Sequence, residues 1–148
     1  MICLSNIGKP GEELFKRIMG GRNYSIEDVR DVPFYQCKDI DFVLTSPTSG
    51  LTKTFEVKWD YNINHTGNLY LEIANSKSVV KGKGWYEFCE ADYLAYGNTA
   101  TKEFYIIPLL ELKKRVNELP YRSAICGRGE SIGRLVSLND IKDIIQTL

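Results

Sequence analysis

The sequence predicts an α/β domain in which helices flank a central β-sheet. Apolar and charged residues alternate over residues 55–60, as in a strand that buries one face and leaves the other open. A helical pattern follows the breaker cluster at residues 8–11 and ends at Gly20 and Gly21, with Leu14, Phe15, Ile18 and Met19 on one face. The chain has 148 residues, enough for one core and too few for two, so we expect a single domain over residues 1–148.

The chain between this helix and residue 60 predicts a β-hairpin. Residues 24–32 hold apolar anchors for a short first strand, and residues 39–45 form the next predicted strand. A turn at residues 46–50 joins that strand to the alternating stretch at residues 55–59. The pattern does not determine the register in which these two strands pair.

The second half predicts further strands and two helices. A polar connection leads to a third alternating strand at residues 69–73, a charged loop at 75–84, a short helix at 85–90, and strands at 91–96 and 103–107 joined by a turn at Gly97 and Asn98. A helix begins at Pro108, carries a stripe of Leu109, Leu112, Val116 and Leu119, and stops at Pro120. A loop at 127–133 precedes a capping box at 137–140 and a closing helix with Ile141, Ile144, Ile145 and Leu148 on its apolar face. We treat residues 120–148 as a C-terminal extension whose placement the pattern leaves open.

Charge and cysteine usage bound the function. Lysine plus arginine equals aspartate plus glutamate at 19 each, which argues against a protein that coats nucleic acid but permits a local basic groove. Cys3, Cys37, Cys89 and Cys126 are scattered and accompany a single histidine, so a zinc site is not expected and the cysteines predict buried thiols in a reducing compartment. No signal sequence and no segment of transmembrane length are evident, so we expect a cytoplasmic protein without a membrane partner.

Glu56 and Lys58 share the open face of the alternating strand, about 7 Å apart along it. A carboxylate beside an ammonium group suits half of a metal-dependent phosphodiesterase site, although it also suits a solvated face. A second Glu-x-Lys triplet, Glu111 to Lys113, falls on a predicted helix surface, where the spacing carries no meaning. The triplet alone is therefore weak evidence, and its surroundings decide.

Those surroundings resemble the PD-(D/E)XK nuclease superfamily, with its restriction-endonuclease-like fold of a mixed central sheet flanked by helices. The order is a helix with a glutamate, a strand opening with aspartate, a turn, and a strand carrying Glu-Val-Lys-x-Asp. The resemblance is closer to small phage and bacterial members, whose Thr-Gly-Asn turn, apolar strand ending in glutamate and Ala-Asp-Tyr strand correspond to residues 66–68, 69–72 and 91–93. The match spans roughly residues 8–107.

Carried over by position, the resemblance implies a metal site and a catalytic lysine. Asp41 and Glu56 would bind a divalent ion together with the carbonyl group of Val57, and such hard oxygen ligands suit Mg²⁺, or Mn²⁺ in its place. Lys58 would hold or deprotonate the attacking water, or neutralise charge on the phosphate. Glu12, on the rim of the first helix's apolar face, would contact the metal through water.

One position departs from the family pattern, and two lysines outside the motif are further candidates. Ile40 stands where the family has a proline, and Asp39 could compete with Asp41 for the ligand role; we prefer Asp41 because residues 42–44 begin the strand directly after it. Lys81 and Lys83, in the charged loop, are candidates for contacts with DNA phosphates, although most such lysines are only solvated.

These implications favour a metal-dependent endonuclease that hydrolyses DNA phosphodiester bonds. With no net charge, it would bind its DNA partner through the shared groove of a homodimer or through a separate specificity protein. The alternative is a catalytically inactive nuclease-fold module that binds nucleic acid or a protein partner. A third hypothesis, a plain α/β domain with an accidental triplet, requires the carboxyl groups of Asp41 and Glu56 to lie far apart.

Overall fold

A six-stranded mixed sheet forms the centre of the molecule. The computed structural model describes residues 8–78, 82–127 and 129–147. The sheet has the order β1-β2-β3-β6-β7-β10, with β1 Ser25–Asp28, β2 Phe42–Thr45, β3 Thr52–Asp60, β6 Tyr93–Asn98, β7 Glu103–Pro108 and β10 Gln146–Thr147. Strands β3 and β6 run parallel, and each of the other neighbouring pairs is antiparallel.

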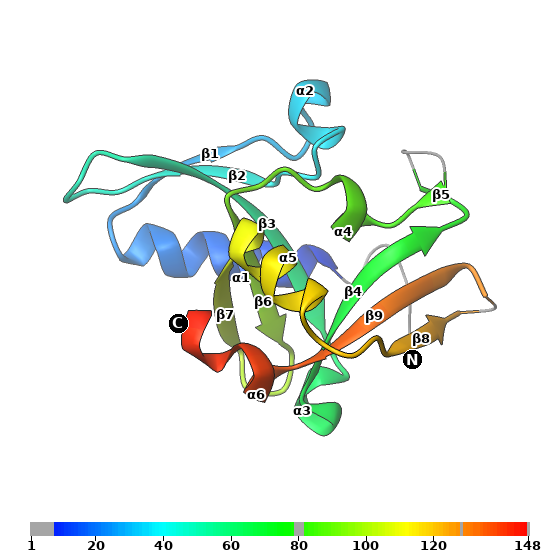
Figure 1. Ribbon diagram of the computed structural model, residues 1–148. Coiled ribbons are helices and arrows are strands. Elements are labelled where there is room, and N and C mark those ends of the chain that lie inside the picture. The colour runs from blue at the N-terminus through cyan, green and yellow to red at the C-terminus, as the bar shows by residue number, and fades with distance from the viewer. Residues whose placement is uncertain (1–7, 79–81, 128, 148) are drawn as a thin grey trace.

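A second, antiparallel sheet stands beside the first (Figure 1). Its order is β5-β4-β9-β8, with β4 Asn68–Asn75, β5 Gly82–Lys83, β8 Ser123–Cys126 and β9 Ser131–Ser137. A bulge interrupts the pairing of β4 with β9 between Glu72 and Ala74. The third strand predicted from the sequence is thus real, but it belongs to this second sheet.

Helices cover both faces of the central sheet. They are α1 Gly8–Gly21, α2 Pro33–Gln36, α3 Ile63–Thr66, α4 Trp85–Phe88, α5 Leu109–Asn117 and α6 Leu138–Ile141, followed by the 3₁₀ helix η1 Lys142–Ile144. Helix α1 lies against one face, and α5 lies on the opposite side (Figure 1). Within the described residues, no helix is long and apolar enough to cross a membrane.

Two apolar clusters hold these layers together. The α1-side core joins Phe15 and Met19 to Phe42, Leu44, Phe55, Val57, Ala95, Phe104 and Ile106 of the sheet. The ring of Phe15 is its centre, with centroids 5.5 Å from those of Phe55 and Phe104. The α5-side core packs Leu94, Ile107, Leu109, Leu112 and Val116 against Leu69, Leu71 and Val136 of the second sheet. The central sheet is therefore covered on both faces, and Phe55, Glu56 and Val57 in the middle of β3 are buried.

Several sequence predictions are confirmed. Helix α1, the hairpin of β2 and β3, the pairing of β6 with β7, and helix α5 with its buried stripe of Leu109, Leu112 and Val116 all form. The capping role of Ser137 is also confirmed, since its Oγ accepts a hydrogen bond from the N–H group of Asn139 at 3.3 Å.

The predicted turn at Gly97 is wrong, and the predicted loop at 127–133 is wrong from Ser131 on, where β9 begins. Both errors have one physical reason. Gly97 lies inside β6, where a Cβ atom would overlap the ring of Trp59 and approach Phe104 Cε1 to 2.7 Å. Gly133 lies inside β9, where a Cβ atom would overlap the ring of Tyr70. In both strands glycine makes room for an aromatic ring and does not mark a turn.

The ends of two predicted elements also differ from those in the structure. The closing helix lasts one turn, because residues after η1 leave the helix and Gln146 pairs with Ile106 at the edge of the central sheet. Strand β2 begins at Phe42, not at residue 39, because Asp39 has a positive φ of 52° that turns the chain away.

The prediction of four buried thiols is wrong in part. Cys89 is buried and free, but Cys37 is exposed and Cys126 is disulfide-bonded. Cys3 lies outside the described residues.

Substitution at Gly97 tests this packing. Gly97→Ala should lower the free energy of unfolding by about 1–3 kcal/mol, because its methyl group has no space beside Trp59 and Phe104. Gly21→Ala is the matched control, since nothing lies within 4 Å of its added Cβ, and it should leave stability unchanged or raise it by up to about 1 kcal/mol. Urea denaturation measures both, and equal losses would contradict the packing described.

Candidate active site

The register of the β2–β3 hairpin brings Asp41 and Glu56 together. The paired ladder of the two strands ends at Phe42 and Phe55, and Asp41 directly precedes Phe42. The two carboxyl groups are close enough that the charge of Asp41 raises the pKa of Glu56. The main-chain N–H of Asp41 donates to the carbonyl of Phe55 at 2.9 Å. The N–H of Val57 in turn donates to Asp41 Oδ2 at 2.9 Å, so the carboxylate takes the place of the next backbone acceptor. The third hypothesis above needed these two carboxyl groups far apart, and the register argues against it.

Glu56 is nearly inaccessible, which corrects the prediction of an open face. Its side chain is 3% exposed because it lies beside Leu94, its partner on β6, which belongs to the α5-side core. Glu56 Oε1 is 2.7 Å from Lys58 Nζ, although the two residues are spaced further apart along the strand. Oε2 of the same carboxylate is buried and accepts no hydrogen bond. An unpartnered buried carboxylate oxygen is costly, and it indicates a place for a cation.

Lys58 is held from three sides. Besides Glu56, its Nζ lies 3.5 Å from Asp39 Oδ2 and 4.7 Å from the ring centroid of Trp85 in α4. The thiol of Cys89, just after α4, donates to the carbonyl oxygen of Asp39 at 3.3 Å and fixes that turn. Asp39 therefore faces the ammonium group, whereas Asp41 faces the backbone of Val57.

Glu12 lies near Asp41 and forms an ion pair with Arg30. Its Oε2 lies 2.9 Å from Arg30 Nη1, and Arg30 also binds Glu13 and Asp28 at 2.8 and 2.6 Å. Glu12 is still close enough to Asp41 that its charge raises the pKa of that carboxyl group. Glu13 is exposed and meets the site only through Arg30.

Burial dominates the electrostatics of the site. Burial, with the charge of Glu12, raises the pKa of Asp41 to about 6, despite the opposing effects of Lys58 and the Val57 N–H. Burial and the charge of Asp39 raise the pKa of Glu56 well above its ordinary value. For Lys58 burial alone would lower the pKa, but the charges of Asp39 and Glu56 outweigh it and raise the pKa. The site therefore concentrates more negative charge than its single lysine balances.

The donor set fits a divalent cation of the hard, oxygen-seeking kind. Within the described residues, no three acidic, histidine or cysteine side chains converge as a closed metal cage. Asp41 and Glu56 supply two carboxylates, and one of these retains an unpartnered oxygen. Mg²⁺ is commonly bound by one or two carboxylates with water and phosphate completing its shell, so an open pair suits it.

Two hollows meet at Asp39. One, of about 440 Å³, is lined by Arg30, Asp39 and Asp41 among others. The other, of about 810 Å³, is lined by Asp39, Lys58 and Trp85 together with residues of β4 and of the β8–β9 connection. Asp39 and Asp41 can thus be reached from the first hollow and the Lys58 ammonium group from the second, whereas Glu56 lines neither.

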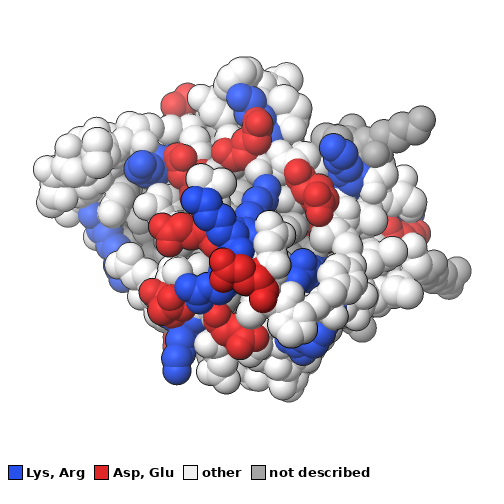
Figure 2. Space-filling model, in the orientation of Figure 1, with Lys and Arg blue, Asp and Glu red and all other residues white. Residues whose placement is uncertain are grey.

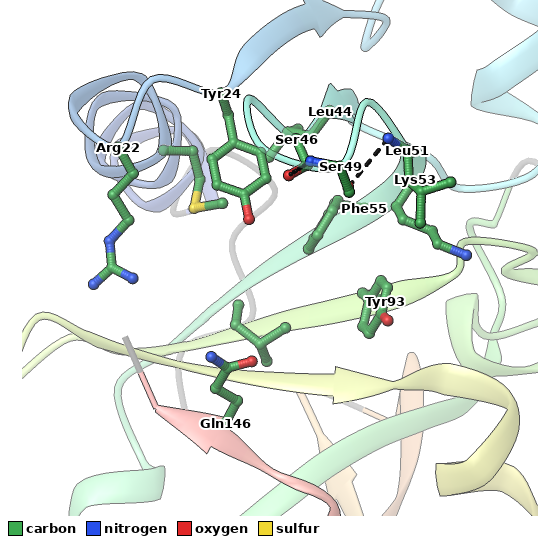
Figure 3. A pocket seen from close by; sticks show the side chains of 12 residues that line it. Arg22, Tyr24, Leu44, Ser46, Ser49, Leu51, Lys53, Phe55, Tyr93 and Gln146 are labelled. Carbon is green, nitrogen blue, oxygen red and sulfur yellow. Dashed lines mark hydrogen bonds between the residues drawn. The ribbon is translucent and has the colours of Figure 1, made fainter.

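A third hollow, shown in Figure 3, lies on the α1 side of the sheet and measures about 280 Å³. Arg22 and Lys53 stand on opposite sides of it, and Phe55 and Tyr93 contribute aromatic walls. None of the site residues predicted from the sequence is among those that line it.

Of the two predicted phosphate-contacting lysines, the structure describes only Lys83. Lys83 is exposed on β5 and is not among the residues that line either hollow at Asp39. Lys81 lies outside the described residues.

Sequence reasoning missed Arg30 and set Trp85 aside. The only signal for Arg30 was a basic residue among acids after a weak strand, which is common on solvated surfaces. Trp85 is 9% exposed and has the appearance of an ordinary core residue; only its position under Lys58 distinguishes it.

Comparison with known proteins adds to this geometry. Neither the known protein-family models nor the curated proteins yield a match. A solved bacterial homing endonuclease, I-Ssp6803I, is similar in structure over 90% of this chain and 80% of its own, with a TM-score of 0.52 and 15% sequence identity. The fold is restriction-endonuclease-like. The resemblance to the PD-(D/E)XK nucleases predicted from the sequence is confirmed at the level of the fold, including its mixed central sheet with flanking helices.

The buried charge of Asp41 lowers the free energy of unfolding of this restriction-endonuclease-like fold. The variant Asp41→Asn tests this. The folded pKa of Asp41, about 6, lies above its ordinary value of 3.8, so the charged carboxylate destabilises the fold above pH 6 and the cost vanishes on acidification. Without metal, Asp41→Asn should be more stable than the native protein by roughly 1–3 kcal/mol at about pH 8, with little gain at about pH 4. Urea denaturation at both pH values measures this, and a gain independent of pH would contradict the electrostatic origin.

Proposed function

We propose that this protein is a metal-dependent endonuclease that hydrolyses DNA phosphodiester bonds. The observation that carries the proposal is the clustering of Asp41, Glu56 and Lys58 where the β2–β3 ladder ends, with Lys58 Nζ 2.7 Å from Glu56 Oε1. A nuclease-like fold and a buried carboxylate with an unpartnered oxygen support it independently.

In this proposal Asp41, Glu56 and the carbonyl group of Val57 would hold Mg²⁺, or Mn²⁺ in its place. Bound there, the ion would supply Lewis-acid chemistry for hydrolysis of a phosphodiester. Asp41 is the better ligand than Asp39, because the Val57 N–H orients its carboxylate next to the backbone of β3. Glu12 would contact the ion through water, and its ion pair with Arg30 would determine the strength of that contact.

Lys58 would act directly on the reacting groups. Its ammonium lines the larger hollow at Asp39, where a phosphate could approach. There it would hold the attacking water or neutralise the negative charge that grows on the phosphate oxygens.

DNA binding would not rest on a general basic surface. The 19 basic residues are balanced by 19 acidic ones, and both signs are interspersed over the face shown in Figure 2. We propose that the bound cation, Lys81 and Lys83 supply local positive charge, and that two copies of the chain combine their grooves on one duplex. The whole chain, residues 1–148, would act as one nuclease-like domain in the cytoplasm.

One observation favours the alternative, a nuclease-fold module that binds nucleic acid or a protein and does not cut. Glu56 already has a counter-ion, since Lys58 neutralises one of its oxygens at 2.7 Å. A module of this kind would need no cation, and its binding to DNA would be the same with and without Mg²⁺.

Plasmid cleavage in Mg²⁺ or Mn²⁺ separates these functions. The native protein should nick or linearise the plasmid, and Glu56→Gln and Lys58→Met should each slow cleavage by roughly 100-fold or more. Glu111→Gln is the matched control, because it alters the exposed glutamate of the second Glu-x-Lys triplet on α5 and should cut at the native rate. Absence of cleavage with both metals, or full activity in Glu56→Gln, would refute the endonuclease.

A further inference from the structure

The ammonium group of Lys58 lies among three side chains, two of which the proposed metal site does not use. Its ammonium contacts Glu56 Oε1 at 2.7 Å, Asp39 Oδ2 at 3.5 Å and the ring of Trp85 at 4.7 Å. Of these three, only Glu56 is a proposed ligand for a metal. Asp39 lies in the connection before β2 and Trp85 lies in α4, so the contacts of Lys58 join these two segments to β3.

The local backbone holds Asp39 facing Lys58. Its backbone has a positive φ of 52°, and its carbonyl accepts a hydrogen bond from the Cys89 thiol at 3.3 Å. Asp39 Oδ2 is buried and accepts no hydrogen bond, so Lys58 Nζ at 3.5 Å is the charge that it faces. Asp41 differs, since its Oδ2 is engaged by the Val57 N–H.

Trp85 packs rigidly on another side of the Lys58 ammonium group. Its backbone N–H donates to Glu72 Oε1 at 3.4 Å, and its ring meets that of Tyr86 edge-on with centroids 6.0 Å apart. The side chain is 9% exposed, so the ring is fixed by packing. An ammonium group over an indole face is attracted by the ring's negative quadrupole.

Carboxylates outnumber the basic groups around Lys58. Asp39, Asp41 and Glu56 act on its single ammonium group, and Glu12 shares Arg30 with Glu13 and Asp28. When ionised, these carboxylates exceed the local positive charge, which favours the binding of a cation. A cation between Asp41 and Glu56 would also repel the ammonium group that now sits on Glu56.

We propose that Asp39 and Trp85 are positioning residues that retain Lys58 beside the site when a divalent cation takes the Glu56 carboxylate. Lys58 and the cation compete for Glu56, and the released ammonium stays between Asp39 and Trp85 and does not swing into the hollow that it lines. This inference rests on the proposed nuclease function and assigns Asp39 to the lysine, not to the metal.

Manganese affinity, measured by calorimetry on the full chain, tests the assignment without any turnover. Asp39→Asn should bind Mn²⁺ within about threefold of the native protein, whereas Asp41→Asn should lose roughly 10- to 100-fold in affinity. Lys58→Met should bind Mn²⁺ several-fold more tightly, because the competing charge is gone. Asp31→Asn, which removes an exposed charge from the same connection, is the control and should match the native protein.

Cleavage kinetics test the positioning role. Asp39→Asn and Trp85→Leu should lower kcat by roughly 10- to 100-fold with KM for DNA little changed. Trp85→Phe keeps an aromatic face and should recover most of that loss, which a purely structural role of Trp85 would not require. Thermal melting of each variant checks that it is folded, and Trp85→Phe with Asp39→Asn still decides the matter if Trp85→Leu does not fold.

The outcomes are distinct. If the native protein neither binds Mn²⁺ nor cuts DNA, the proposed function fails and takes this inference with it. If the native protein does both, and Asp39→Asn loses Mn²⁺ affinity as Asp41→Asn does, Asp39 is a metal ligand and the inference alone is overturned. Unchanged kcat in Asp39→Asn or in a folded Trp85→Leu, or a fall in Mn²⁺ affinity in Lys58→Met, would overturn it as well.

Discussion

The structure of the site depends on one cross-strand relation, the placement of Asp41 close to Glu56 at the end of the β2–β3 ladder. The pairing of Phe42 with Phe55 fixes where this ladder ends, and both rings are anchored in the α1-side core against Phe15. A slip of one residue would expose those rings and turn Asp41 toward the helix, since alternate residues of a strand face opposite sides. The packing of apolar residues on one face of the hairpin therefore fixes the geometry of charged residues on the other.

The same burial makes the site unfavourable for the isolated fold. Glu56 sits beside Leu94 under the α5-side core with one oxygen unpartnered, and Asp41 has a raised pKa because it too is removed from water. A protein selected only for stability would place apolar residues at such positions. Local conflicts of this kind are expected where function has shaped the sequence, and Lys58, Arg30 and the Val57 N–H reduce the conflict without removing it.

Much of this arrangement could be predicted from sequence, because it rests on local patterns. Alternation set Glu56 and Lys58 on one face, and the strand that begins directly after Asp41 was the reason to prefer it to Asp39 as a ligand. Burial of that face could not be predicted, because it depends on β6 and α4, which are distant in the chain. The pairing of β4 with β9 and the strand after η1 were missed for the same reason, since long-range pairing overrode a helical pattern at Ile144 and Ile145. The engagement of Glu12 by Arg30 likewise depends on how α1 packs beside β1.

The central claim is that Asp41 and Glu56 together bind one divalent cation. A crystal structure of the native protein soaked in Mn²⁺, with anomalous diffraction data, tests it most directly. The account predicts an anomalous peak within coordination distance of oxygens from both carboxylates, with Lys58 Nζ displaced from Glu56. Full occupancy elsewhere with no peak between these two side chains, or a peak bound to Asp39 in place of Asp41, would contradict it.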